Sequence, residues 1–204
     1  MKQMWDNRYG AEPYAYGTQP NVFLKEKLAQ YALSGKLLMP AEGEGRNAVY
    51  AASQNIAVFA FDISEKGRAK AIKLANEHNV EINYNVGDFL KMDYIDNSFD
   101  GAALIYAHFP PPILSVYHQK ISQLIKPGGI VILEGFSKNN LPLREANPDV
   151  GGPNKIEMLF SKECILADFP NFEVLELEEA TVKLEEGLYH NGIAKLIRFV
   201  GRKQ

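Results

Sequence analysis

The sequence predicts an α/β fold in which a doubly wound, mostly parallel sheet has helices on both faces. Three observations support this prediction. Short apolar runs alternate with helix-like segments over most of the chain, the runs are apolar on both sides, and two alternating apolar–polar runs end the chain. Strands buried on both sides are typical of parallel sheets covered by helices, whereas alternation is typical of antiparallel strands with one solvated face.

The first strand–helix pairs lie between residues 35 and 79. A short strand is predicted at 35–39, followed by a helix over 45–54 and a second buried strand at 56–62. A helix is predicted over 64–79, because Ser64 is a suitable N-cap and apolar residues recur behind it at helical spacing.

The same order continues to residue 136. The alternating run 81–88 predicts a third strand, and the apolar run 99–109 predicts a fourth. A helix is expected over 111–125, where prolines occupy the first turn. The turn KPGG then leads into a fifth strand at 130–136.

The rest of the chain departs from this rhythm. The runs 172–187 and 192–203 alternate and are joined by turn residues, which predicts an antiparallel pair at the sheet edge. Before them, 137–155 is rich in Asn, Pro and Gly and is expected to be either a mobile loop over a ligand or a long connector. No internal repeat is visible, so residues 1–204 are expected to form one domain.

Charge and cysteine content exclude several classes of function. The 204 residues carry a net charge of −3 and no Lys/Arg-rich block, which argues against nucleic acid as a partner. Cys164 is the only cysteine and lies in an amphipathic stretch, so a buried thiol is expected, with no disulfide and no metal site. The N-terminus is too polar for a signal peptide, and no apolar run approaches the length of about 18 residues that would span a membrane. Both features predict a cytoplasmic protein without membrane contact.

Gly43 and Gly45 form a candidate cofactor loop directly after the first strand. The segment GEGRNA fits the loose pattern G-x-G-x-x-A, which permits a tight turn and close approach of a ligand but also occurs by chance. Asp62 ends the second strand, 17 residues after Gly45. A carboxylate there can accept both ribose hydroxyls; the alternative is that Asp62 caps the next helix.

Acidic residues in this loop bear on the choice of cofactor. At about 6 Å and an effective dielectric of about 20, Glu42 and Glu44 would each oppose a unit of pyrophosphate charge by about 3 kcal/mol. A ligand with a sulfonium and an ammonium group suits them, unless they are solvated charges near a helix N-terminus. After the third strand, Asp88 and Phe89 could bind an adenine amino group and cover its ring; otherwise they are a turn aspartate and a core phenylalanine.

With these motifs the chain resembles the class I S-adenosylmethionine-dependent methyltransferases, and among them the tellurite-resistance and thiopurine methyltransferase branch. The resemblance covers almost the whole chain. It implies seven strands in the order 3-2-1-4-5-7-6, the last antiparallel, and S-adenosylmethionine as cofactor. The segments that carry it are 40–52, 59–64, 85–89, 99–111 and 125–136, with the N-terminal segment and the tail 185–203.

The resemblance also implies roles for single residues. Met39 and Ala41 stand where the family has an aspartate and a glycine, so the amino-acid end of the cofactor must be held differently, with Glu42 as the expected contributor. Tyr106 and His108 would lie near the transferring methyl group. The residues expected around the cofactor are Ala41, Glu42, Gly43, Gly45, Asp62, Ile63, Asp88 and Phe89.

Residues 1–24 are expected to cover the cofactor, in front of a core formed by 35–204. This segment is rich in aromatic residues without a regular pattern, so it is expected either to fold over the site or to pack on the sheet edge. The candidate residues for substrate contact or for a lid are Trp5, Arg8, Tyr9 and Tyr16.

The expected chemistry is methyl transfer to a small molecule, such as a thiol or a chalcogen oxyanion. The donor methyl group is already activated, so the protein aligns the reactants and, where needed, removes a proton. His108 and His190 are the candidate bases, each with an ordinary alternative at a strand end or turn. Two other classes fit the glycine pattern: a nicotinamide-dependent oxidoreductase and a non-catalytic nucleotide-sensing domain.

Overall fold

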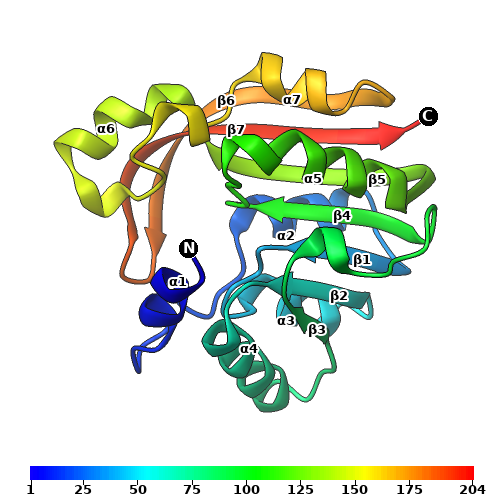
Figure 1. Ribbon diagram of the computed structural model, residues 1–204, viewed down its shortest axis with the longest axis horizontal. Helices are drawn as coiled ribbons and strands as arrows, with labels where there is room; N and C mark the ends of the chain where they lie inside the picture. Colours follow the sequence, from blue (N-terminus) through cyan, green and yellow to red (C-terminus); the bar gives the residue numbers. More distant parts are fainter.

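The protein is built around one sheet. The computed structural model describes residues 1–204, with strands β1 (Lys36–Pro40), β2 (Ala57–Asp62), β3 (Asn83–Val86), β4 (Phe99–Ile105), β5 (Ile125–Phe136), β6 (Phe172–Glu186) and β7 (His190–Lys203). The seven strands lie in the order β3-β2-β1-β4-β5-β7-β6 (Figure 1). Strands β1 to β5 are parallel, and β7 is antiparallel to both β5 and β6. The predicted fold class and the C-terminal hairpin are therefore confirmed.

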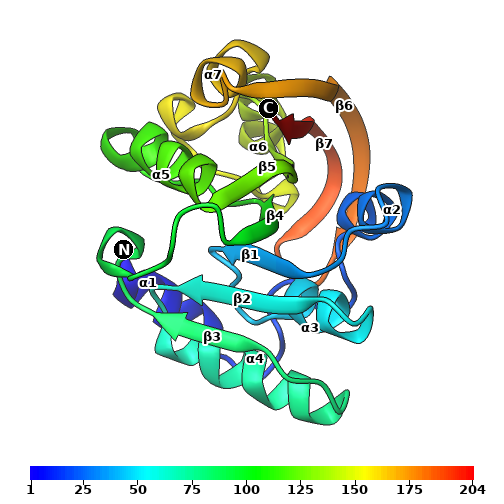
Figure 2. The same ribbon diagram turned by 90° about the vertical axis from the view of Figure 1, so that its right-hand side faces the viewer.

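Helices cover both faces of this sheet (Figure 2). They are α1 (Lys2–Tyr9), α2 (Val22–Gln30), α3 (Arg46–Ser53), α4 (Glu65–Glu77), α5 (Pro111–Leu124), α6 (Leu141–Ala146) and α7 (Lys162–Asp168), and short 3-10 turns lie at Phe89–Lys91, Lys138–Asn140, Pro148–Val150 and Ile156–Met158. One core joins α2, α3 and α4 to the sheet through residues such as Leu24, Ala48 and Ala71. The other joins α5 and α7 to the opposite face through Ile121 and Ile165.

Several local predictions hold, and the differences have physical reasons. Ser64 caps α4, because its hydroxyl accepts the Gly67 N–H at 3.0 Å. Strand β4 ends at Ile105 rather than at 109, because Tyr106 takes a φ of +53° and turns the chain away from the sheet. The segment 137–155 is neither a structureless loop nor a bare connector, since it contains α6 and two 3-10 turns.

The N-terminal arm, residues 1–24, meets the tip of the β6–β7 hairpin beside the carboxyl ends of the strands (Figure 1). The arm contains α1 and the start of α2, which the sequence analysis did not predict. The Leu188 N–H donates to the Ala15 carbonyl at 2.8 Å. A Cβ on Gly187 would lie 2.5 Å from the Gly17 nitrogen, so the close approach of arm and hairpin requires glycine there. None of the helices combines the length and apolar character needed to cross a bilayer.

Candidate active site

A cavity of about 440 Å³ lies beyond the carboxyl ends of β1, β2 and β4. Sheets of this type bind ligands at that edge. Thirteen residues singled out in the sequence line it: Trp5, Arg8, Tyr9, Tyr16, Ala41, Glu42, Gly43, Glu44, Asp62, Ile63, Tyr106, His108 and His190. Three others, Gly45, Asp88 and Phe89, do not line it.

The turn after β1 is held in a left-handed backbone form. Ala41, Gly43 and Gly45 have φ values of +53°, +58° and +85°. A Cβ on Gly43 would lie 2.6 Å from the Tyr9 hydroxyl, so the arm packs directly on this glycine. The Gly43 N–H donates to Asp62 at 3.1 Å, which ties the turn to the end of β2.

Two carboxyl groups face this turn, a buried one on Asp62 and a half-buried one on Glu42. Asp62 accepts hydrogen bonds from Gly43 and, at 2.9 Å, from the Ser64 N–H; it does not cap α4, because Ser64 does. Burial raises the pKa of Asp62. Glu42 accepts the Ala48 N–H at 2.7 Å, and burial raises its pKa to about 8. Near pH 7 the Glu42 side chain is therefore mostly protonated.

Glu44 does not have the role that the loop sequence suggested. Its carboxylate is buried, accepts the Ala15 N–H at 2.7 Å and pairs with Lys70 at 2.7 Å. It is therefore neither a solvated charge nor a free charge facing a ligand. The argument that two free carboxylates repel a pyrophosphate is therefore wrong. Lys70 compensates Glu44, and Glu42 is mostly protonated near pH 7. Glu44 instead anchors the arm.

The adenine contacts expected after β3 are only partly available. The Phe89 side chain is fully buried and stacks on Phe61, with ring centroids 4.5 Å apart. It therefore cannot cover an adenine ring, and the alternative of a core phenylalanine is correct. Asp88 is exposed and accepts the Tyr117 hydroxyl at 2.9 Å and the Leu90 N–H at 3.1 Å. Gly87 lines the cavity in their place.

The N-terminal arm lies over the cavity. Trp5 stacks on Tyr9 with centroids 5.3 Å apart. The Arg8 guanidinium donates to the Tyr16 hydroxyl at 2.7 Å. The Ser64 hydroxyl donates to Asp6 at 2.6 Å, which fixes α1 to the start of α4. Of the two expectations for this segment, the arrangement over the site is the one observed.

Tyr106 presents a buried hydroxyl without a hydrogen-bond partner. Its left-handed backbone is unusual for a tyrosine and costs about 1–3 kcal/mol, which the surrounding contacts must offset. The Tyr106 N–H donates to the Glu134 carbonyl at 2.7 Å and holds this turn. A buried hydroxyl without a hydrogen-bond partner is rare, and this one belongs to a residue that lines the cavity beside Glu134.

His108 is corrected as a candidate base, because main-chain groups occupy both ring nitrogens. Nδ1 lies 2.8 Å from the Met158 carbonyl oxygen, and Nε2 lies 3.0 Å from the Phe136 amide nitrogen. A carbonyl only accepts and an amide only donates, so Nδ1 carries the proton and the Nε2 lone pair is used. Burial lowers the pKa of His108 to about 4. Its role is to join β5 to the segment around Met158.

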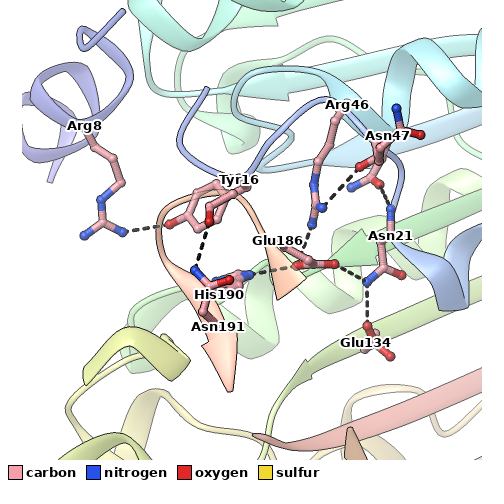
Figure 3. A network of polar contacts seen from close by, with 11 residues as sticks. Arg8, Tyr16, Asn21, Arg46, Asn47, Glu134, Glu186, His190 and Asn191 are labelled. Atoms are coloured by element: carbon pink, nitrogen blue, oxygen red, sulfur yellow. Dashed lines mark hydrogen bonds and ion pairs between the residues drawn. The ribbon is translucent and has the colours of Figure 1, made fainter. Parts of the chain in front are cut away.

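His190 has one ring nitrogen engaged and the other free. Nδ1 lies 3.0 Å from Glu186, and Arg46 binds the same carboxylate oxygen at 3.0 Å (Figure 3). Burial alone would raise the pKa of Glu186, but His190 and Arg46 hold it at about 2. Burial lowers the pKa of His190, so near pH 7 the ring is neutral, donates from Nδ1 and keeps the Nε2 lone pair free. The ring lies between Tyr16 and Tyr106, with centroids 4.4 and 4.5 Å away.

Sequence reasoning missed several functional neighbours. Glu186 is one of many glutamates in an alternating run, and nothing in the run distinguishes it. Arg46 lies inside the glycine pattern, where the sequence predicts only a helix. Arg144 and Asn154 come from the segment whose role was left open, and both line the cavity. No group of three or more His, Cys, Asp or Glu side chains is arranged to hold a metal.

Comparison with known proteins shows a similarity to methyltransferases. A family model described as a methyltransferase domain matches residues 38–129. Sterol 24-C-methyltransferase ERG6 of Saccharomyces cerevisiae is 29% identical over 121 residues, which are 54% of this chain and 32% of that protein. The chain spans only 26% and 32% of the length of two curated relatives it matches.

Solved structures with the same fold include TehB from Haemophilus influenzae, with a TM-score of 0.70, 15% identity and coverage of 100% of this chain and 67% of that one. Magnesium protoporphyrin IX methyltransferase from Synechocystis PCC 6803, solved with bound SAH, has a TM-score of 0.66, 15% identity and coverage of 89% and 80%. The sheet order agrees with the methyltransferase fold of these structures, in which the order β3-β2-β1-β4-β5-β7-β6 ends in an antiparallel pair. Residues 38–129, slightly under half of this chain, are similar to a methyltransferase domain.

Proposed function

We propose that this protein transfers the methyl group of S-adenosylmethionine to a small acceptor, a thiol or a chalcogen oxyanion. The observation that carries the proposal is the division of the cavity. Glu42 follows β1 and Asp62 ends β2, whereas Tyr106 follows β4 and His190 begins β7. Strands β4 and β7 lie on the other side of β1 from β2 in the sheet order. A donor side with carboxyl groups therefore faces an acceptor side with a hydroxyl and a free imidazole nitrogen.

The donor side suits S-adenosylmethionine, which supplies a methyl group on a positively charged sulfur. Glu42 would hold the ammonium group at the end of the cofactor where the family aspartate is absent. Asp62 would bind the ribose with lone pairs that Gly43 and Ser64 leave free, since a carboxylate offers about four acceptor positions. Ala41, Gly43, Gly45 and Ile63 would shape the turn and its wall, and Asp88 would reach the adenine end from the rim.

The acceptor side supports one base. The acceptor atom would lie near His190 Nε2, which takes its proton, while Glu186 stabilises the imidazolium that forms. The unpaired Tyr106 hydroxyl would orient the acceptor. A thiol ionises near neutral pH, so it depends least on proton removal by His190, whereas a hydroxyl depends on it most.

The size of the cavity favours a small acceptor. About 440 Å³ is near the lower end of the range of about 300–1,000 Å³ for ligand sites, and it has to hold the cofactor too. A sterol, the acceptor named for the matched relatives, would not fit beside it. Structural similarity to TehB supports the tellurite-resistance branch only through the fold.

We also propose that residues 1–204 act as one domain with residues 1–24 as a cover that moves when ligands exchange. The contacts of Asp6 with Ser64 and of Ala15 with Glu44 and Leu188 would have to break and re-form. The non-catalytic alternative, a domain that senses the nucleotide, would bind cofactor but transfer nothing.

Two measurements test the proposed function. Calorimetry should give binding of S-adenosylhomocysteine and none of NAD. A screen of small thiols, selenite and tellurite with labelled S-adenosylmethionine should then give labelled product and S-adenosylhomocysteine. Binding without transfer to any acceptor would support the sensing domain, and tight NAD binding without a response to S-adenosylhomocysteine would remove the proposal.

A further inference from the structure

Two arginines in the cavity wall have no carboxylate partner. Three arginines line the cavity, namely Arg8, Arg46 and Arg144. Arg46 is paired with Glu186 at 3.0 Å. Arg8 donates to the Tyr16 hydroxyl and lies over the Tyr189 and Trp5 rings, 4.6 and 5.2 Å from their centroids. Arg144 donates from Nε to the Gly152 carbonyl at 2.8 Å. In a chain with a net charge of −3, two unpaired guanidinium groups in one cavity indicate an anionic ligand.

Both arginines approach His190. Arg8 reaches it through Tyr16, whose ring lies 4.4 Å from the imidazole. Arg144 donates to the Gly152 carbonyl, and the preceding residue, Gly151, packs against His190. A Cβ on Gly151 would lie only 2.5 Å from the His190 ring. Each unpaired arginine is thus linked through one neighbouring segment to His190, on the acceptor side of the cavity.

The walls around these cations are apolar. Ile113, Phe136 and Met158 line the same cavity, and Phe136 stacks on Tyr106 with centroids 5.0 Å apart. An inorganic oxyanion has no apolar surface to cover such walls. A carboxylate on a carbon skeleton satisfies both features, because a guanidinium binds a carboxylate through two parallel hydrogen bonds while the skeleton contacts the rings.

We propose that the acceptor is a small organic acid, whose carboxylate is bound by Arg8 and Arg144 and whose nucleophilic S–H or O–H group lies at His190. This inference rests on the proposed function and narrows its substrate class. Methyl transfer then forms a new S–C or O–C bond and breaks the sulfonium S–CH₃ bond. The acceptor proton passes to His190 Nε2, and neutral S-adenosylhomocysteine leaves.

Trp5 provides a binding signal that does not depend on turnover. It is the only tryptophan of the chain, lines the cavity and has the Arg8 guanidinium 5.2 Å from its ring centroid. The probes are 3-mercaptopropionate, its uncharged counterpart 3-mercaptopropionamide, and selenite. Each is titrated into the protein with and without saturating S-adenosylhomocysteine, following Trp5 fluorescence and confirming affinities by calorimetry.

The expected result is that 3-mercaptopropionate binds at least about tenfold more tightly than the amide, because hydrogen bonds to charged groups are strong. Arg8→Gln and Arg144→Gln should each remove most of this preference. Arg202→Gln is the matched control and should keep it, because Arg202 pairs with Glu173 outside the cavity.

Three results would overturn the inference: equal binding of acid and amide, acid binding that survives both cavity substitutions, or no anion binding. Selenite binding that depends on both arginines, without binding of 3-mercaptopropionate, would assign the cations to an inorganic oxyanion and also overturn it. Failure of the proposed function has a different signature. In that case the wild-type protein would not bind S-adenosylhomocysteine, or would methylate nothing, whatever the anions do.

Discussion

Cofactor binding is expected to release a proton from Glu42. This half-buried side chain has its pKa raised to about 8, chiefly by loss of solvent, with the Ala48 N–H and Arg46 opposing the shift and Asp62 adding to it. At pH 7 a group with a pKa of about 8 is about nine-tenths protonated. A cationic ligand beside Glu42 favours the carboxylate, so binding lowers its pKa and expels the proton.

The size of the effect follows from the same numbers. If the pKa falls well below 7 in the complex, binding at pH 7 releases about 0.9 proton, and affinity is about tenfold below its limit at high pH. Affinity therefore rises with pH as Glu42 ionises. Glu42→Gln removes the titrating group. The proton release should then disappear, and the affinity should no longer rise with pH over the range in which Glu42 ionises.

Calorimetry in two buffers of different ionisation enthalpy measures the released proton directly. The free ligand is the same in both titrations, so the difference between wild type and Glu42→Gln reports the proton lost by Glu42 together with any change in the ammonium group that it would contact. Glu65→Gln, at an exposed position of α4, is the control. Equal proton release by the wild type and the Glu42→Gln variant would refute the reasoning, as would proton uptake by the wild type relative to that variant.

Three further outcomes are expected. Asp62→Ala should weaken S-adenosylhomocysteine binding at least about tenfold in calorimetry, because it removes the acceptor of the Gly43 N–H; unchanged affinity would take Asp62 out of the site. His190→Gln should slow turnover more than it weakens cofactor binding and should flatten the acid limb of the pH–rate profile. The acid limb arises because the His190 base has a lowered pKa and is protonated, and so lost, only as the pH falls below about 6.5. An unaltered pH–rate profile would assign the base to another residue. His108→Ala should instead lower the melting temperature. Gly43→Ala should destabilise the fold by about 1–3 kcal/mol in denaturant unfolding, because its Cβ meets Tyr9 at a left-handed φ.

The sequence was sufficient where local pattern determines structure. Strands buried on both faces and a hairpin with alternating residues follow from periodicity alone, and both were predicted. The arm was missed, because the segment KQMWDNRY has no apolar periodicity and α1 is fixed by distant contacts, such as Asp6 with Ser64. Those contacts depend on the folded core, which a local pattern does not contain.

The two histidines show where site prediction stops. His108 and His190 are equivalent as residue types, and their difference lies in the groups bound to each ring. Main-chain atoms of Phe136 and Met158 saturate His108, and no sequence pattern encodes a main-chain atom that far along the chain. Glu186 is likewise defined only by the hairpin register, which places it opposite His190 in the β6–β7 ladder.

Arg46 connects the parts of the chain that form the site. It follows the last glycine of the turn, pairs with Glu186 at the hairpin tip and donates to the Gln19 carbonyl of the arm at 3.3 Å (Figure 3). The same carboxylate orients His190. A movement of the glycine turn would therefore be transmitted to His190, the proposed base, through the Arg46–Glu186 ion pair. The side chains of this pair are only 9% and 14% exposed. Breaking a buried ion pair is costly. We therefore expect the cofactor side, which contains Arg46, and the acceptor side, which contains Glu186 and His190, to become ordered together when the arm closes on the hairpin.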